Sequence, residues 1–508
     1  MMKSGQDVCR YSKSLILTQP RTIGRQDMLT TGKSTRSKPL LDVPELPKEP
    51  KSGKHLVVDG LGHQEKGMMP SISLISPYKP IICGIADYTY FLTREAPPHS
   101  CDVISFDLDN YGVPLSGDQP SATDHVWYGI SSRDDFSATS ILQGLRPRAN
   151  QVLWFQHEFG IWRDNARFIN MLRDLDIPKV VTLHTLHFQS KETRYGLCSE
   201  EYSFLHSLLP HTDAITVFSD GVYQAVTNAF PKHADKVHVL RHGTHLYPRF
   251  ARMSKAEAKA RIHEYLVDQS ELDKRSKDNL RRQRVFLDPD TIIIGGTGFI
   301  TASKGTELLY HVHNVLQQVL PEHKIAAVYT GLLREADSSI DSEFAAEMKA
   351  KHNGKGQFFL ETYLPGDMLA AMLRALDIYF YWPNNCTQSG IVAHALGAGA
   401  TIACRDREGV GETVKMAGGL VSADFGQLIF KIAQAILHSK HRAEISERAL
   451  GYAEKFSWRN QVLRHLELAE QLCLSRIQRP ADRKSLATRP KATSMLWHIK
   501  ADESRSRV

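Results

Sequence analysis

The feature that most constrains the fold is the alternation of short apolar runs with longer amphipathic stretches, in two successive series. Apolar runs of about four or five residues, bounded by Pro, Gly, Asp or His, are typical of buried strands. The first series of expected strands is 72–75, 103–106, 152–155, 180–183, 214–218 and 237–240. The second is 291–295, 325–329, 357–360, 378–382, 401–404 and 420–421. Stretches such as 166–175, 202–209 and 306–320 have the spacing of amphipathic helices. Strands that alternate with helices predict an α/β fold with two doubly wound parallel sheets.

A charged stretch, 252–287, separates the two series and predicts a domain boundary. We expect a disordered tail (1–70), an N-terminal Rossmann-like domain (71–250), a charged helical linker or insert (251–290), a C-terminal Rossmann-like domain (291–440), a C-terminal helix that packs back across the domains (441–475) and a second disordered tail (476–508). Because ligands of open parallel sheets bind outside the carboxyl ends of the strands, the cleft between the domains is the expected site.

Both tails are basic. Residues 1–54 carry eleven Lys or Arg against five Asp or Glu, and residues 476–508 carry nine against three. Since the whole chain has a net charge of +7, the part between the tails is acidic by about five charges. Such tails favour solvated disorder, with contact to an anionic membrane or to nucleic acid as the alternatives. We expect no nucleic-acid partner and leave a peripheral membrane contact open.

The cysteines and the apolar runs bear on the compartment. The seven cysteines are scattered and have no spacing suited to zinc, which favours reduced thiols. The sequence has neither an apolar run long enough to span a bilayer nor the apolar stretch of a secretory signal. We therefore expect a cytoplasmic protein and leave open a peripheral position at the inner face of the membrane.

A glycine-rich turn follows the expected strand 291–295. Residues 295–305 read GGTGFITASKG and lead into an amphipathic helix. Gly298 and Gly305 allow close backbone approach to a phosphate, and Lys304 supplies a positive charge. The order of Lys304 and Gly305 is not that of a Walker A loop. The alternative is a tight strand-to-helix turn with a surface lysine.

A second loop, 384–399, follows the expected strand 378–382. Ser389 and Gly390 stand where this loop turns into a helix, so their backbone N–H groups can point at an anion. This pattern predicts a second phosphate cradle. The alternative is a helix of small residues packed tightly against the sheet.

Polar residues also follow strands of the first series. His157 and Glu158 follow the expected strand 152–155, and His184 follows 180–183, so they are candidates for one edge of the cleft. The alternative is that the histidines are structural donors. Asp107 and Asp109 follow the strand 103–106 and have the pattern of a metal-binding pair, but a solvated strand end is the favoured interpretation. We expect no metal.

The order of these motifs resembles that of the retaining GT-B glycosyltransferases of family four. The likeness rests on PYKPIICGIADY (77–88), QHEFGI (156–161), TLHT (182–185), RHG (241–243), GFITASKG (298–305), QSGIVAHALGAG (388–399), GVGET (409–413) and FSW (456–458). It covers roughly residues 71–472.

The resemblance implies that Lys304 contacts the donor diphosphate, that Ser389 and Gly390 lie in the donor loop, and that His184 lies beside the donor sugar. It places Glu158 near the acceptor side. We also expect Glu412 to be one of the donor-binding residues and His157 to be one of the catalytic residues. The chain departs from the family at three positions: Phe299 replaces an arginine, and Cys386 and His394 stand where a pair of glutamates is common.

The expected function is transfer of a hexose, mannose-like or glucose-like, from a nucleotide diphosphate sugar to a glycan or lipid-linked acceptor, with retention, in polysaccharide or glycoconjugate synthesis. No cofactor is expected beyond the nucleotide sugar as co-substrate. One alternative is a nucleotide-sugar epimerase or sugar phosphorylase on the same fold. Another is a degenerate paralogue that binds a sugar or nucleotide without catalysis.

Overall fold

The computed structural model describes residues 70–112, 115, 125–146, 148, 150–333 and 339–478. The two predicted tails lie outside the described residues, except for Pro70 and residues 476–478 at their inner ends. Within the described ranges no helix is both long and apolar enough to cross a bilayer.

The first domain consists of one sheet and the helices that cover it. Its strands are β1 (Ser71–Ile75), β2 (Cys101–Phe106), β3 (Val126–Ile130), β4 (Gln151–His157), β5 (Lys179–Leu183), β6 (Ala214–Val217) and β7 (Val237–Val239). Its helices are α1 (Gly84–Arg94), α2 (Ala138–Gly144), α3 (Asn165–Arg173), α4 (Ser199–Leu208) and α5 (Asp220–Ala229). All the strands are parallel, in the order β3-β2-β1-β4-β5-β6-β7, so the order reverses between β1 and β4.

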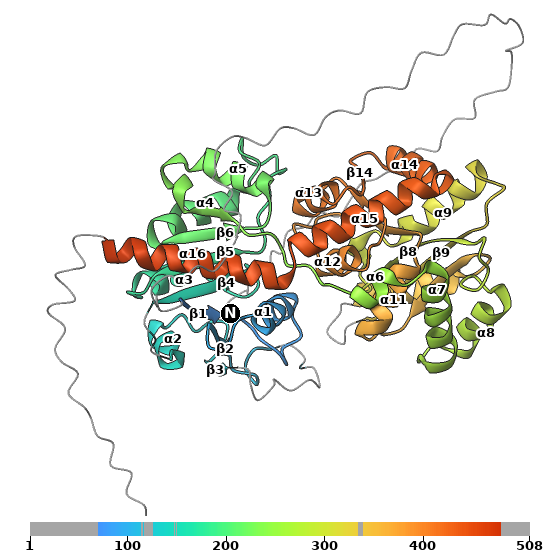
Figure 1. Ribbon diagram of the computed structural model, residues 1–508. Coiled ribbons are helices and arrows are strands. Elements are labelled where there is room, and N and C mark those ends of the chain that lie inside the picture. Colours follow the sequence, from blue (N-terminus) through green and yellow to red (C-terminus); the bar gives the residue numbers. More distant parts are fainter. Residues whose placement is uncertain are drawn as a thin grey trace, which may run out of the picture. The chain divides into compact units, whose positions relative to one another are not determined.

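The second domain repeats this plan. Its strands are β8 (Ile292–Thr297), β9 (Ile325–Gly331), β10 (Asn353–Gly354), β11 (Gln357–Glu361), β12 (Ile378–Tyr381), β13 (Ile402–Arg405) and β14 (Leu420–Ser422). Its helices are α9 (Glu307–Val319), α10 (Ser339–Lys351), α11 (Gly366–Ala375), α12 (Gly390–Gly397), α13 (Glu408–Met416) and α14 (Phe425–Leu437). The order is β10-β11-β9-β8-β12-β13-β14, with only the short β10 antiparallel, and it reverses between β8 and β12. Figure 1 shows β8 and β9 of this sheet among the helices of the second domain.

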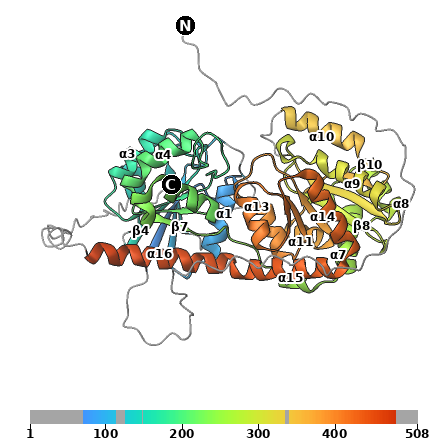
Figure 2. The same ribbon diagram turned by 90° about the horizontal axis from the view of Figure 1, so that it is seen from above.

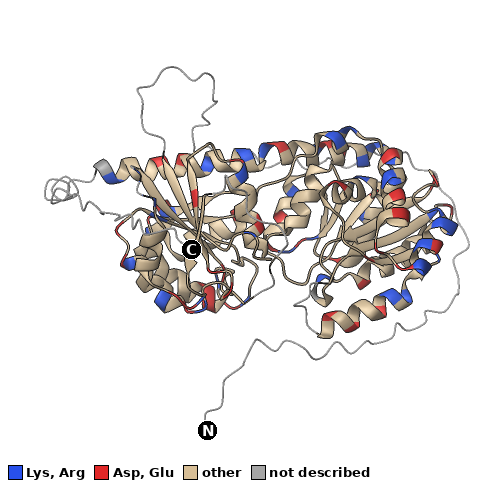
Figure 3. Cartoon of the chain, turned by 90° about the horizontal axis from the view of Figure 1, so that it is seen from below, with Lys and Arg blue, Asp and Glu red and all other residues tan. Residues whose placement is uncertain are grey.

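Alternation along each strand builds a separate apolar cluster on each face of the sheet. In β4, Leu153 packs with α2 to α5, whereas its neighbour Trp154 packs on the other face with α1 and the C-terminal helix α16 (Trp458–Gln478). Few charged residues lie on the strands, and most lie on helices and loops (Figure 3). This pattern explains why both sheets are visible in the sequence as apolar runs.

The charged stretch between the two series folds as α6 (Pro248–Arg252), α7 (Lys255–Glu264), a π-helical turn (Tyr265–Gln269) and α8 (Lys274–Gln283). It is more than a linker, because Ala258, Ile262 and Leu280 are fully buried in the core of the second domain. Lys259 is buried with Asp377 in an ion pair of 3.0 Å and also donates to the carbonyl oxygen of Thr291. These contacts make α7 and α8 an integral part of the second domain.

The end of the chain returns to the first domain. After α15 (Ser439–Lys455), α16 packs against β1, β4 and α1 (Figure 2). The chain therefore passes between the domains twice, and the two passages are hydrogen-bonded: Thr244 N donates to the carbonyl oxygen of Phe456 at 2.9 Å, and Trp458 N donates to that of Thr244 at 3.3 Å.

Candidate functional site

A cavity of about 530 Å³ lies at the carboxyl ends of β8 and β12, where the strand order of the second sheet reverses. Thr297 ends β8, Tyr381 ends β12, and both line the cavity. On the opposite side the lining comes from α1, from residues that follow β7 and from Trp458 at the start of α16. This is the position at which doubly wound sheets bind ligands.

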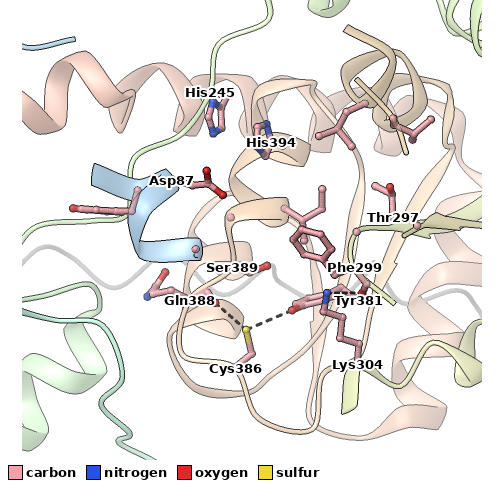
Figure 4. Close-up of a pocket in the computed structure, with 18 of the residues that line it drawn as sticks. Asp87, His245, Thr297, Phe299, Lys304, Tyr381, Cys386, Gln388, Ser389 and His394 are labelled. Atoms are coloured by element: carbon pink, nitrogen blue, oxygen red, sulfur yellow. Dashed lines mark hydrogen bonds between the residues drawn. The ribbon is translucent and has the colours of Figure 1, made fainter. Parts of the chain in front are cut away.

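The glycine-rich turn forms one wall. Gly298 has φ +130° and Gly305 has φ +65°, and a Cβ at Gly305 would lie 2.5 Å from the carbonyl oxygen of Trp382, so both positions require glycine. Lys304 ends a 3-10 turn (Ala302–Lys304), and its Nζ donates to the carbonyl oxygen of Phe299 at 2.7 Å. Gly298, Phe299 and Lys304 line the cavity, whereas Gly305 does not. Figure 4 shows the side chains of Phe299 and Lys304 next to each other. The turn therefore presents a cation beside exposed backbone.

The start of α12 forms the adjoining wall. Ser389 is the N-cap and makes no side-chain capping bond, and a Cβ added to Gly390 would meet no atom within 4 Å. Both residues line the cavity, and the first N–H groups of a helix carry partial positive charge. Lys304 and the N-terminus of α12 thus supply positive potential to the same cavity.

The wall on the side of the first domain is aromatic. Tyr88 and Phe91 of α1, His242, His245 and Trp458 line it, together with Asp87. The ring of Tyr88 makes edge contacts with those of His242 and Trp458, at centroid distances of 5.3 and 5.1 Å. Asp87 is the one carboxylate among the described lining residues. It projects from α1 into the cavity, across from Lys304 (Figure 4).

The three histidines of the cavity are neutral at physiological pH. Burial lowers the pKa of His242 to about 4 and that of His394 to about 4. Burial, together with the neighbouring His394 and His242, lowers the pKa of His245 to about 2. Among the described residues that line the cavity, Lys304 is therefore the one that carries a full positive charge.

Cys386 stands in the loop before α12, at a position where the resemblance leads one to expect glutamate. Its thiol donates to the carbonyl oxygen of Gln388 at 3.0 Å and lies 3.5 Å from the hydroxyl of Tyr381. Burial raises the pKa of Cys386, so it remains a neutral thiol that shapes the loop.

The three residues predicted to be catalytic do not line this cavity. His157 is buried and stacked on Phe204, and burial lowers its pKa to about 3. Glu158 turns back to accept a hydrogen bond from Gly160 N at 2.7 Å. His184 is hydrogen-bonded through Nε2 to Oε1 of Gln156 at 2.7 Å, and burial lowers its pKa to about 3. His184 reaches the cavity wall indirectly, because its carbonyl oxygen accepts a hydrogen bond from Thr387 Oγ1 at 3.1 Å, in the loop before α12.

Glu412, predicted with the donor-binding residues, joins the two domains. Its carboxylate accepts hydrogen bonds from the backbone N–H groups of Asp220 and Gly221 at the start of α5, at 2.7 and 2.9 Å. It also forms an ion pair with buried Arg241. Glu412 therefore caps α5 and stands apart from the cavity lining.

The aspartate pair after β2 lies in a turn. Oδ1 of Asp107 accepts hydrogen bonds from the backbone N–H of Asp109 and from both N–H and Nδ2 of Asn110, at 2.9 to 3.1 Å. The bonds form a local turn motif at the strand end. Neither aspartate lines the cavity.

The described residues contain one group of His, Cys and Glu side chains close enough together to share a metal ion: His187, Cys198 and Glu201. Hydrogen bonds within the group already occupy the carboxylate. Oε1 of Glu201 accepts a hydrogen bond from Nδ1 of His187 at 2.6 Å, which raises the pKa of His187, and Oε2 accepts one from Cys198 N at 3.0 Å. Burial raises the pKa of Cys198 to about 11, and a neutral thiol is a poor metal ligand.

The sequence did not point to Asp87, His242, His245 or Trp458 as parts of one wall. They come from separate segments that meet only through α1, the passage after β7 and the return of α16. The motifs PYKPIICGIADY, RHG and FSW marked three of these segments, but not their proximity.

No family model and no curated protein sequence matches the chain. Solved structures match it. A UDP-forming α,α-trehalose-phosphate synthase from Burkholderia vietnamiensis is 12% identical, with a TM-score of 0.58 over 80% of this chain and 100% of that one. A trehalose-6-phosphate structure from E. coli with bound UDP-2-fluoro glucose is 11% identical, with a TM-score of 0.55 over 79% and 99% of the two chains. A UDP-forming synthase of the same kind from Burkholderia xenovorans, in complex with glucose-6-phosphate, is 11% identical, with a TM-score of 0.53 over 78% and 100%.

At this level of identity the likeness shows the fold. It confirms the predicted architecture of two Rossmann-like domains, that of GT-B proteins, over nearly the whole length of each neighbour. Membership of family four and retention of configuration stay predictions.

Proposed function

We propose that the chain is a glycosyltransferase that moves a hexose from a nucleotide diphosphate sugar to an acceptor hydroxyl. The observation that carries the proposal is the convergence of Lys304, the Gly298 turn and the N-terminus of α12 on one cavity. A diphosphate is the ligand that matches this positive potential and these open backbone groups. The structural neighbours include one with a bound UDP-sugar analogue, which supports the same class of donor.

The chemistry follows from where charge develops. The bond from the anomeric carbon to the diphosphate oxygen breaks, a bond from that carbon to the acceptor oxygen forms, and the acceptor proton passes to the departing diphosphate. Negative charge on the diphosphate grows during this step, so the fixed charge of Lys304 and the helix end stabilise the transition state more than the bound donor. Retention is proposed from the resemblance to family four, and the leaving diphosphate then serves as the base.

The predicted catalytic residues take supporting roles in this proposal. His184 holds Thr387 through its carbonyl oxygen and so positions the loop that leads to Ser389. Gln156 and His157 end the neighbouring strand β4 and hold His184: Oε1 of Gln156 bonds to its Nε2, and the carbonyl oxygen of His157 accepts from its backbone N–H at 3.0 Å. His184 is thus a positioning residue for the donor loop.

A screen of nucleotide sugars tests the proposal. A donor at 100 times its dissociation constant should raise stability by about 2.7 kcal/mol, which thermal unfolding detects. The stabilising donor is then incubated with and without an acceptor, and nucleotide diphosphate release and sugar isomerisation are both measured. Release that depends on an acceptor supports transfer. Isomerisation of the donor alone indicates an epimerase, and stabilisation without turnover indicates a binding protein.

A further inference from the structure

The wall opposite Lys304 carries information about the second substrate, and the inference from it rests on the proposed transferase function. In the region around Asp87 the described lining residues include no lysine or arginine. The side chain of Asp87 is 53% exposed, so the carboxylate is accessible from the cavity.

Asp87 also offsets the positive potential at the N-terminus of α1, which would otherwise attract an anion to this wall. It lies in the first turn of α1, and Gly84 at the start of that helix lines the cavity. A carboxylate in the first turn offsets the positive end of the helix dipole. The start of α1 is therefore a poorer phosphate site than the start of α12, which has no acidic residue in its first turn.

The nearby groups do not restore a positive charge. His242, His245 and His394 are neutral because burial lowers their pKa values to about 4, about 2 and about 4. The ammonium of Lys79 lies 3.9 Å from Oδ1 of Asp87 and 4.3 Å from the centre of the Tyr90 ring, behind the lining. Its charge is thus partnered by the carboxylate itself.

The remaining surface suits a sugar ring. Phe91 and Trp458 lie at a centroid distance of 5.7 Å with an angle of 29° between their rings, and both line the cavity. The hydroxyl of Tyr88 is buried without a hydrogen-bond partner among the described residues. Aromatic faces pack against the C–H faces of sugars, while a carboxylate and neutral imidazoles pair with hydroxyl groups.

We propose that this wall is the acceptor subsite and that it takes an uncharged sugar or polyol, with Asp87 accepting a hydrogen bond from an acceptor hydroxyl. Asp87 is then a specificity-determining residue that disfavours sugar phosphates, because its carboxylate faces the acceptor and pairs with the Lys79 ammonium that would otherwise attract a phosphate. The subsite differs in this respect from the Burkholderia xenovorans neighbour, whose structure is a complex with glucose-6-phosphate.

The test compares each hexose with its own 6-phosphate on the full chain. Glucose, mannose and their 6-phosphates are titrated in the presence of UDP, with binding followed by saturation-transfer NMR. Each is then offered as acceptor to the donor that the nucleotide-sugar screen selects. The wild-type protein should bind the uncharged hexose at least about tenfold more tightly than its 6-phosphate. Asp87→Asn should lower the ratio of the affinity for the hexose to the affinity for its 6-phosphate about tenfold. Asp87→Lys should make the protein prefer the 6-phosphate.

Glu95→Gln is the matched control. Glu95 is exposed at the other end of α1, and its substitution changes the net charge by the same amount as Asp87→Asn. This variant should keep the wild-type preference. Preference of the wild-type protein for a hexose 6-phosphate, or binding of neither sugar, overturns the proposal, as does an unchanged ratio in Asp87→Asn. Donor binding is measured first in every variant, so loss of the transferase function itself is seen separately.

Discussion

The imidazole rings of His245 and His394 are parallel, with their centroids 3.7 Å apart and an angle of 3° between their planes. His245 follows β7 on the passage between the domains, whereas His394 belongs to α12 in the second domain. The hydroxyl of Tyr247 bonds to Nδ1 of His394, and Nε1 of Trp458 donates to Nε2 of His245 at 3.3 Å. Two imidazole rings this close cannot both be positively charged without strong repulsion. The contact therefore requires that at least one of the two histidines is neutral.

Buried neutral histidines predict that the protein loses stability in mild acid. The six with the lowest pKa values are His157, His184, His242, His245, His394 and His465. In the unfolded chain they take up protons near pH 6.5, but in the folded protein only at about pH 4 or below, so the unfolded state binds more protons as the pH falls. The free energy of unfolding should fall between pH 7 and pH 5, by up to about 1.4 kcal/mol per pH unit for each such group. Urea unfolding at several pH values measures the slope.

His465 isolates one of these groups away from the cavity. It stacks against Trp154 at a centroid distance of 4.6 Å, and burial lowers its pKa to about 4. His465→Gln should reduce the slope of the unfolding free energy against pH by the contribution of about one bound proton. A stability curve that stays flat from pH 7 to pH 5 in the wild-type protein would contradict the assignment of neutral buried histidines.

Replacing Lys304 should separate donor binding from folding. Lys304→Ala removes a charge that faces the growing charge of the diphosphate, so we expect a loss of about 2–4 kcal/mol in transition-state stabilisation, seen in kcat/KM. Isothermal titration with UDP should show weaker binding, while the melting temperature should stay close to that of the wild-type protein. Lys324→Ala, on an exposed lysine paired with Asp288, is the control and should leave UDP binding unchanged. Wild-type UDP affinity in Lys304→Ala would reduce the glycine-rich turn to a structural element.

Phe299 offers the opposite experiment. It lines the cavity, is 43% exposed, and contributes its carbonyl oxygen to Lys304, so a new side chain there leaves that backbone contact in place. Phe299→Arg should add a second cation near the diphosphate and tighten UDP binding by about tenfold at low salt. Phe299→Leu is the neutral control. The gain should shrink as salt is added, and a gain independent of salt would argue against an ionic contact.

Glu412→Ala should weaken the junction between the domains. It removes the acceptor of the first two N–H groups of α5, which keeps only the N-cap bond from Val222 N to Ser219, and it removes a carboxylate partner of buried Arg241. Arg241 keeps its 2.6 Å ion pair with Asp220 and its hydrogen bond to the carbonyl oxygen of Phe218. We expect a loss of about 2–4 kcal/mol in the free energy of unfolding, measured with urea. Glu447→Ala, on an exposed glutamate of α15, should change it by less than about 0.5 kcal/mol. If both variants unfold alike, Glu412 does not stabilise the junction.

Donor binding and turnover should survive a chelator. The positive charge in the cavity comes from Lys304 and the start of α12, and Oδ1 of Asp107 is taken up by three hydrogen bonds of its own turn. Turnover measured before and after EDTA treatment, with manganese added back, checks this. Complete loss that manganese restores would show that a metal ion shares the neutralisation of the diphosphate.

The sequence predicted both sheets because the signal is local: a fully buried strand is an apolar run whatever its partners are. It missed β3, which is an edge strand, is half-exposed along most of its length and contains Gly129. The two loops that line the cavity after β8 and β12 were also predictable, because each follows a strand next to the point where the sheet order reverses. The aromatic wall and the cap made by Glu412 depend on how α1, α5 and α16 pack, and no short motif in the sequence encodes that packing.

Because α16 returns to the first domain, the first domain can complete its fold only after the second domain has been synthesised. Trp458, Val462 and Leu466 complete the apolar cluster on one face of the first sheet, against residues such as Leu74 and Tyr88. The ribosome has to translate the whole second domain before these side chains emerge, a delay of roughly 10–45 s at about 5–20 residues per second. During that time the part of this face that α16 covers, next to α1, is open and apolar. The domain that is made first is therefore completed last. The apolar surface that awaits α16 is the part of the nascent chain that most needs a chaperone.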